Sequence, residues 1–168
     1  MEREHDSGPV IAVTAEDDRF SHARRAGARL AGRSGSPLIL YNVDAASLFN
    51  EPMPSNWSAE GAGEQFGPRL TAEQLERLGR GPIARQVEQA GSQGIEAYGW
   101  LPTSHGPGPL AEYAREQSAL AVIVPAEHED CDAFCAVLAG TFKPVEKLAE
   151  TAPTRVVVVS SDGSEDVR

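Results

Sequence analysis

Five short runs of Val, Ile and Leu, separated by segments with a helical period, constrain the fold of this chain most. The runs lie at 10–13, 38–43, 95–101, 120–124 and 156–159. Most of them are continuous rather than alternating, as expected of strands that are covered on both faces of a parallel sheet. The third is weaker and alternates around Tyr98 and Trp100. The sequence therefore predicts an α/β fold.

The segments between the runs carry the signals of helices. Phe20 and Ala23 begin a stripe on one helical face. A capping box starts at Thr71, Gly79 should interrupt the helix that follows, and Pro109 suits a first helical position. Strands and helices thus alternate, which predicts a single doubly wound sheet of five parallel strands with right-handed crossovers and helices on both faces. The expected strand order is 3-2-1-4-5.

The length of 168 residues fits one domain, which we expect to span 1–168. The folded body should cover 8–160. Residues 45–68 are rich in proline and glycine and lack a period, so we expect a long loop after the second strand. Residues 161–168 should form a flexible tail.

The net charge of −10 argues against binding to nucleic acid or to an anionic membrane, because both need a basic surface. No apolar run approaches the roughly 20 residues of a membrane-spanning helix. The polar, acidic N-terminal stretch is unlike a secretory signal, so we expect a cytoplasmic protein. Two cysteines do not make a disulfide framework.

In an open α/β sheet, ligands bind beyond the carboxyl ends of the strands, where the strand order reverses. The loops 14–18 and 125–130 should form this crevice, and they carry six carboxylates and no Lys or Arg. A polyphosphate would meet like charge there. The acids are either solvated residues at helix starts, which we favour, or ligands of Mg²⁺ or Ca²⁺.

Phosphate-binding glycine motifs are absent from the sequence. Gly140 and Thr141 could present a backbone N–H and a hydroxyl to an anion, although a helix end followed by a new helix cap explains them equally well. The candidate crevice residues are Thr14, Ala15, Val43, Pro125, Gly140 and Thr141.

Four other side chains that could take part in catalysis or metal binding have simpler explanations. His128, Cys131 and Cys135 have a spacing of the zinc type but lack a fourth ligand, and core packing or a redox pair would also explain the cysteines. His105 has no nucleophile or carboxylate partner that the sequence identifies. We therefore expect no metal site and no catalytic residue, and a small enzyme using His105 or His128 is the least favoured hypothesis.

Three stretches match, in order and pattern, the units of a known family. The first is 10–13 with the Arg/Ala-rich helix and 36–44, the second is 108–114 with 119–124, and the third is 138–141 with 152–159. They are similar to the first β-α-β unit, to the third helix and fourth strand, and to the closing segment of the universal stress protein family, which the chain resembles over most of its length.

The resemblance implies a divergent member that lacks the ATP-binding glycine motif. ATP-binding members carry an Asp at the end of the first strand and a G-x2-G-x9-G-[ST] run after the fourth. Here Thr14 ends the first strand, Glu127 and Asp130 stand at the two earlier glycines, and Gly140 and Thr141 match the end of the run. The implied function is a binding or regulatory domain that is not an enzyme and needs no cofactor. The alternative is an ATP-binding or adenine-nucleotide-binding protein with an atypical phosphate loop.

The resemblance also implies a homodimer that pairs through the last strand, residues Arg155, Val156, Val157, Val158 and Val159. Independently, a Val-rich strand at an uncovered sheet edge would be prone to aggregation, so pairing there is physically reasonable.

Overall fold

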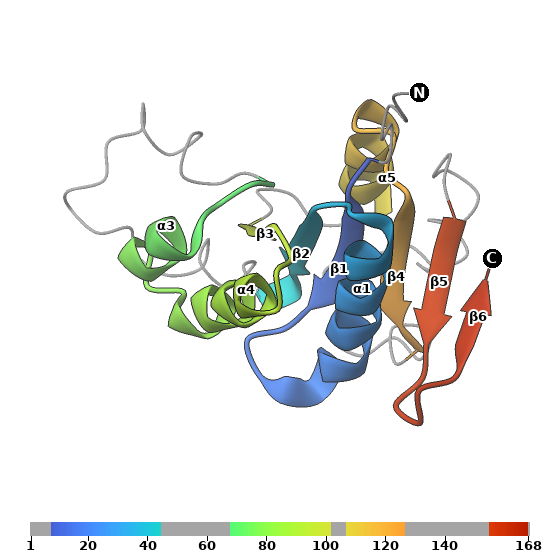
Figure 1. The fold of residues 1–168 in the computed structure, drawn as a ribbon, viewed down its shortest axis with the longest axis horizontal. Coiled ribbons are helices and arrows are strands. Elements are labelled where there is room, and N and C mark those ends of the chain that lie inside the picture. Colours follow the sequence, from blue (N-terminus) through green and yellow to red (C-terminus); the bar gives the residue numbers. More distant parts are fainter. Residues whose placement is uncertain (1–7, 45–67, 102–106, 127–154, 168) are drawn as a thin grey trace.

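Six strands form one sheet in the computed structural model, which describes residues 8–44, 68–101, 107–126 and 155–167 (Figure 1). The strands are β1 (Val10–Thr14), β2 (Leu38–Asn42), β3 (Ala97–Trp100), β4 (Ala121–Pro125), β5 (Arg155–Val159) and β6 (Glu165–Val167). The first five are parallel, in the order β3-β2-β1-β4-β5, and β6 pairs antiparallel with β5. The predicted parallel sheet and its order 3-2-1-4-5 are confirmed.

Helices cover both faces of the sheet. A short 3-10 turn, η1 (Asp18–Phe20), leads into α1 (Ser21–Ser34), and α3 (Ala72–Arg77) and α4 (Gly81–Ser92) follow β2. These helices lie on one face, and α5 (Pro107–Glu116) lies on the other. Such a division follows from right-handed crossovers that first move outward from β1 to β3 and then return to β4.

Local sequence signals set the ends of these helices. The Thr71 side chain accepts from the backbone N–H of Gln74, whose own side chain reaches back to Thr71, so the capping box is present. Gly79, at φ +74°, lies between α3 and α4, and Pro82 lies in the first turn of α4. Gly35, at φ +69°, caps the end of α1.

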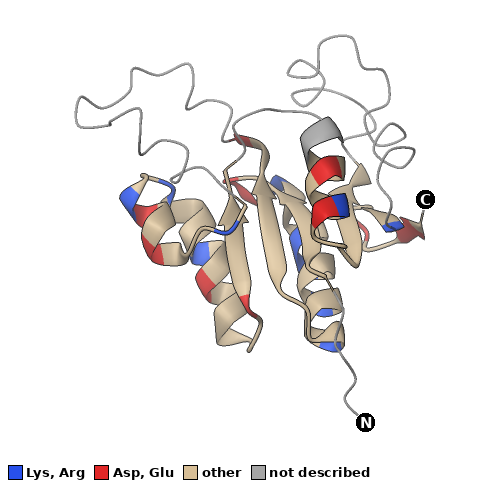
Figure 2. Ribbon diagram, turned by 90° about the horizontal axis from the view of Figure 1, so that it is seen from above, with Lys and Arg blue, Asp and Glu red and all other residues tan. Residues whose placement is uncertain are grey.

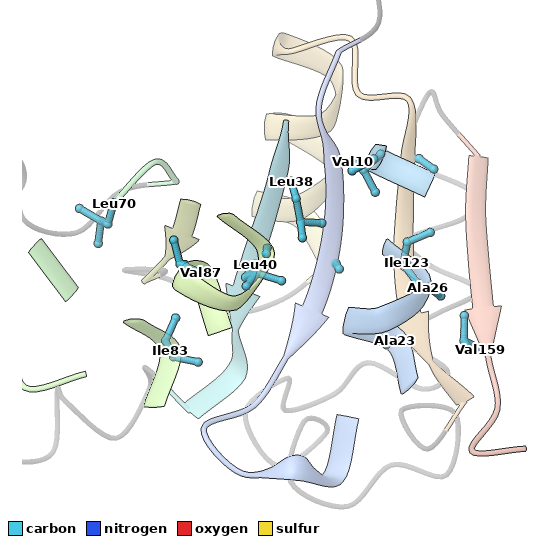
Figure 3. Packing of buried hydrophobic residues seen from close by; sticks show 14 of the residues in the cluster. Val10, Ala23, Ala26, Leu38, Leu40, Leu70, Ile83, Val87, Ile123 and Val159 are labelled. Atoms are coloured by element: carbon cyan, nitrogen blue, oxygen red, sulfur yellow. The ribbon is translucent and has the colours of Figure 1, made fainter. Parts of the chain in front are cut away.

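Two apolar layers sandwich the sheet. On β1, Val10 and Ala12 point to the layer beneath α1 and α4, whereas Ile11 and Val13 point to the layer beneath α5. Figure 3 shows the first layer, in which Leu38 and Leu40 of the sheet lie between the two helices. Full burial of β1, β2 and β4 explains why these runs do not alternate.

The end of the chain differs from the expectation. Residues 161–168 were expected to be a flexible tail, but 165–167 form β6. The Asp162 carboxylate accepts from the backbone N–H of Ser164 at 2.9 Å, and Gly163 takes φ +89°, so the chain turns back onto β5. The sheet therefore has a sixth, antiparallel strand that the sequence analysis missed.

Other expectations fall outside the described residues, namely the structure of 45–67 and of the loop 127–130. Within the described residues, none of the helices has the length and apolar character needed to span a membrane.

Candidate functional site: the crevice at the carboxyl ends of β1, β2 and β4

The structure brings four of the predicted site residues to one edge of the sheet. Thr14 ends β1 and lies opposite Asn42 at the end of β2, while Pro125 ends β4. Ala15 and Val43 follow β1 and β2 directly, with Ala15 fully buried. The strand order reverses between β1 and β4 at this edge, which is where an open α/β sheet binds ligands. Gly140 and Thr141 lie outside the described residues.

The end of β1 is closed by a side chain from α4. Thr14 is fully buried, and its hydroxyl donates to Oε1 of Gln86 at 2.7 Å. Nε2 of Gln86 donates in turn to the carbonyl oxygen of Ala15 at 2.8 Å. This amide satisfies both the hydroxyl and the carbonyl, as buried polar groups require. The Thr14 hydroxyl is thus already engaged within the protein.

An ion pair lies beside this amide. Nη1 of Arg80 donates to Oε1 of Glu16 at 2.5 Å, and the two side chains are only 10% and 26% exposed. Nδ2 of Asn42 approaches the same carboxylate oxygen at 3.4 Å. Arg80 precedes the first turn of α4, where the helix dipole disfavours positive charge, so Glu16 compensates both the burial and the dipole.

A second ion pair extends the network towards solvent. Asp44 accepts from the backbone N–H of Glu16 at 2.9 Å, and its other oxygen pairs with the guanidinium of Arg19. Nε of Arg19 also lies 3.1 Å from Oδ1 of Asp17. Burial alone would lower the pKa of Arg19, but the hydrogen bond and charge of Asp44, with a smaller contribution from Asp17, raise it above its ordinary value.

These pairs correct one part of the electrostatic prediction. The loop 14–18 itself has no basic residue, but Arg19 pairs with Asp17 and Arg80 pairs with Glu16 from outside it. Figure 2 shows charged residues on the helices and near the strand ends, while the strands β1 to β4 carry none. The carboxylates of Glu16, Asp17 and Asp44 therefore do not meet a ligand as unpaired negative charge. Nor do they form a cation site, because no three His, Cys, Asp or Glu side chains in the described ranges gather closely enough to hold a metal ion.

Gln86 and Arg80 were not identified from the sequence. Gln86 follows Ile83 and precedes Val87 on the buried stripe of α4, so a polar residue at a core position was the available signal. Arg80 stands between two glycines and offered no comparable signal. The predictions concerning His105, His128, Cys131, Cys135, Glu127 and Asp130 fall on residues outside the described ranges.

The chain is similar to known proteins in its fold but not in its sequence. Neither a family model nor a curated protein sequence matches the chain. A solved structure described as a universal stress protein in complex with cAMP superposes with a TM-score of 0.54, at 15% identity, over 92% of this chain and 97% of that one. The chain has the universal stress protein fold. The universal stress protein of Archaeoglobus fulgidus in complex with dAMP gives a TM-score of 0.50, at 18% identity, over 90% of this chain and 96% of its own. In both comparisons, the aligned region includes at least 90% of this chain.

Proposed function

We propose that this chain is a regulatory binding domain with the universal stress protein fold, without catalytic activity, and that its crevice does not bind ATP. The observation that carries the proposal is the engaged state of Thr14. The ATP-binding members of the family that the sequence resembles carry an Asp at the end of the first strand. Here Thr14 is fully buried and bonded to Gln86.

The charges of the crevice support the same proposal. Arg19 and Arg80 reach the residues that follow β1 and β2, and both are paired with carboxylates of the protein. A triphosphate bound here would have to compete with Asp44 and Glu16 for them. Breaking a partly buried pair leaves an uncompensated carboxylate, which is unfavourable.

A second candidate is an adenine nucleotide with a single phosphate. The two structural neighbours are described as complexes with cAMP and dAMP, each of which carries one phosphate. A monophosphate needs less positive charge than ATP, so the pairing of Arg19 and Arg80 disfavours it less.

Calorimetric titration separates these functions. ATP with and without Mg²⁺ should release no heat of binding, and inorganic phosphate release from ATP should not exceed that of buffer. A micromolar Kd for ATP would refute the proposal. Binding of AMP, dAMP or cAMP without ATP would establish the second candidate. The matched variant Thr14→Val, which keeps the side-chain shape and removes the hydroxyl, should not alter any nucleotide affinity if Thr14 serves only the structure.

We further propose a homodimer through the last parallel strand, and this requires β6 to move. β5 is paired on one side with β4 and on the other with β6 of the same chain. Glu165 and Asp166 on the exposed β6 would repel a second copy of themselves, as charges on edge strands commonly do. Pairing through Val156 to Val159 therefore depends on release of β6.

A further inference from the structure

A groove separates α1 and α4 on the face of the sheet that both helices cover. Its volume is about 420 Å³, which lies within the range of small-molecule pockets. Leu38 of β2 lies at its base, and its lining also includes Gln86, the α4 residue that closes the end of β1. Figure 3 shows Leu38 and Leu40 between the two helices, with Ala23 and Ala26 of α1 on one side and Ile83 and Val87 of α4 on the other.

The residues that line the groove explain why it stays open. They include Arg24, Arg25 and Ala28 on α1 and Gln89, Ala90 and Gln93 on α4. Two helices side by side on a sheet usually close the gap between them with large apolar side chains. Here the lining residues of the two helices are either small, as Ala28 and Ala90 are, or polar, so the space is not filled and its walls can form hydrogen bonds.

Arg24 supplies a donor to which the described residues offer no acceptor. Its side chain is half-buried, and its Nη1 atom is buried without a hydrogen-bond partner in the described part of the chain. Burial lowers the pKa of Arg24, the charge of Asp18 raises it, and the charge of Arg25 lowers it further. The guanidinium nevertheless stays charged at neutral pH. An unsatisfied buried donor is unfavourable, and more so when it carries charge. Arg25, by contrast, is bonded to the hydroxyl of Ser21 at 3.1 Å.

We propose that this groove binds a small organic anion, a carboxylate or a phosphate ester, whose oxygen accepts from Arg24 and whose other polar atoms meet the amides of Gln89 and Gln93. Two guanidiniums against the single carboxylate of Asp18 leave the lining positive, in a chain whose net charge is −10. Amide side chains both donate and accept, so they suit the polar remainder of such a molecule. The site does not depend on nucleotide binding at the crevice.

The test is an NMR titration of the full chain, labelled with ¹⁵N, with citrate and with inorganic phosphate in separate experiments. We expect at least one probe to shift the side-chain amide signals of Gln89 and Gln93 with a Kd of about 1 mM or lower. Arg24→Gln should weaken this affinity about tenfold or more, because it removes a charge-assisted hydrogen bond. Arg33→Gln removes the same charge from an exposed position of α1 outside the groove and should change the affinity by less than about twofold.

Each result decides the proposal. Binding of citrate alone indicates that the site recognises carboxylates, binding of inorganic phosphate alone indicates that it recognises a phosphate group, and binding of both indicates a general oxyanion site. No shift at Gln89 and Gln93 up to about 10 mM of either probe overturns the site, and so does equal weakening by Arg24→Gln and Arg33→Gln. If Arg24→Gln does not fold, Gln89→Ala on the opposite, exposed wall replaces it, and an affinity that Gln89→Ala leaves unchanged overturns the proposal.

Discussion

Gly27 shows how one missing side chain sets the distance between α1 and the sheet. A Cβ at this position would lie 2.7 Å from the Cβ of Ala12 and 3.3 Å from Cδ1 of Leu38. We expect Gly27→Ala to lower the free energy of unfolding by about 1 kcal/mol, because overpacking exceeds the gain in helix propensity. Gly32→Ala is the matched control on the same helix. It meets only Ile95 at 3.8 Å and should raise that free energy by up to about 1 kcal/mol. Urea denaturation followed by circular dichroism measures both, and equal effects would contradict the packing argument.

The ion pair between Glu16 and Arg80 links the loop after β1 to the start of α4. Glu16→Gln leaves the guanidinium of Arg80, only 10% exposed, without its counter-charge. We expect it to cost roughly 2–3 kcal/mol of stability. Because the two residues contact each other, the double variant Glu16→Gln with Arg80→Gln should lose less than the sum of the two single losses. Additive losses in a double-mutant cycle would show that the ion pair contributes nothing.

At the scale of elements, Asp162 fixes the turn that brings β6 onto β5. Its hydrogen bonds from the backbone N–H and the hydroxyl of Ser164 lower its pKa below the ordinary value of an aspartate. A lowered pKa means that the carboxylate stabilises the turn above its unfolded pKa and that this stabilisation is lost as the pH falls through the folded value. We therefore expect faster amide exchange of 165–167, relative to the β1 amides, below about pH 4. Asp162→Asn should remove the pH dependence, and a β6 that loosens equally in this variant would assign the effect to another group.

Elements formed by local patterns were predictable, and contacts between distant elements were not. The apolar runs indicated the parallel strands because burial on both faces leaves an unbroken run, as in Val10 to Val13. β6 is polar and too short for such a pattern, although Asp162-Gly163 is a hairpin signal that could have located its turn. The pairing of Thr14 with Gln86 joins residues 72 positions apart, and no local signal in one segment specifies its partner in the other. The sequence therefore predicted which residues lie at the carboxyl ends of β1, β2 and β4, but not which side chains close this edge of the sheet.

In the whole molecule, β6 covers the edge of the sheet through which β5 could pair with a second copy of the chain. The backbone of β5 lies between β4 and β6, and four of its five residues are buried valines. Removal of residues 161–168 would expose the outer backbone edge of a strand with high β-propensity, and such an edge pairs readily with an identical one. We expect light scattering at micromolar concentration to show that the truncated protein forms particles with more chains, on average, than the full-length protein does. The full chain with Gly163→Val, which strains the turn at φ +89° without shortening the chain, should move in the same direction. A truncated protein that stays monomeric while the full chain dimerises would place the dimer contact on β6 or elsewhere, and would refute pairing through Val156 to Val159.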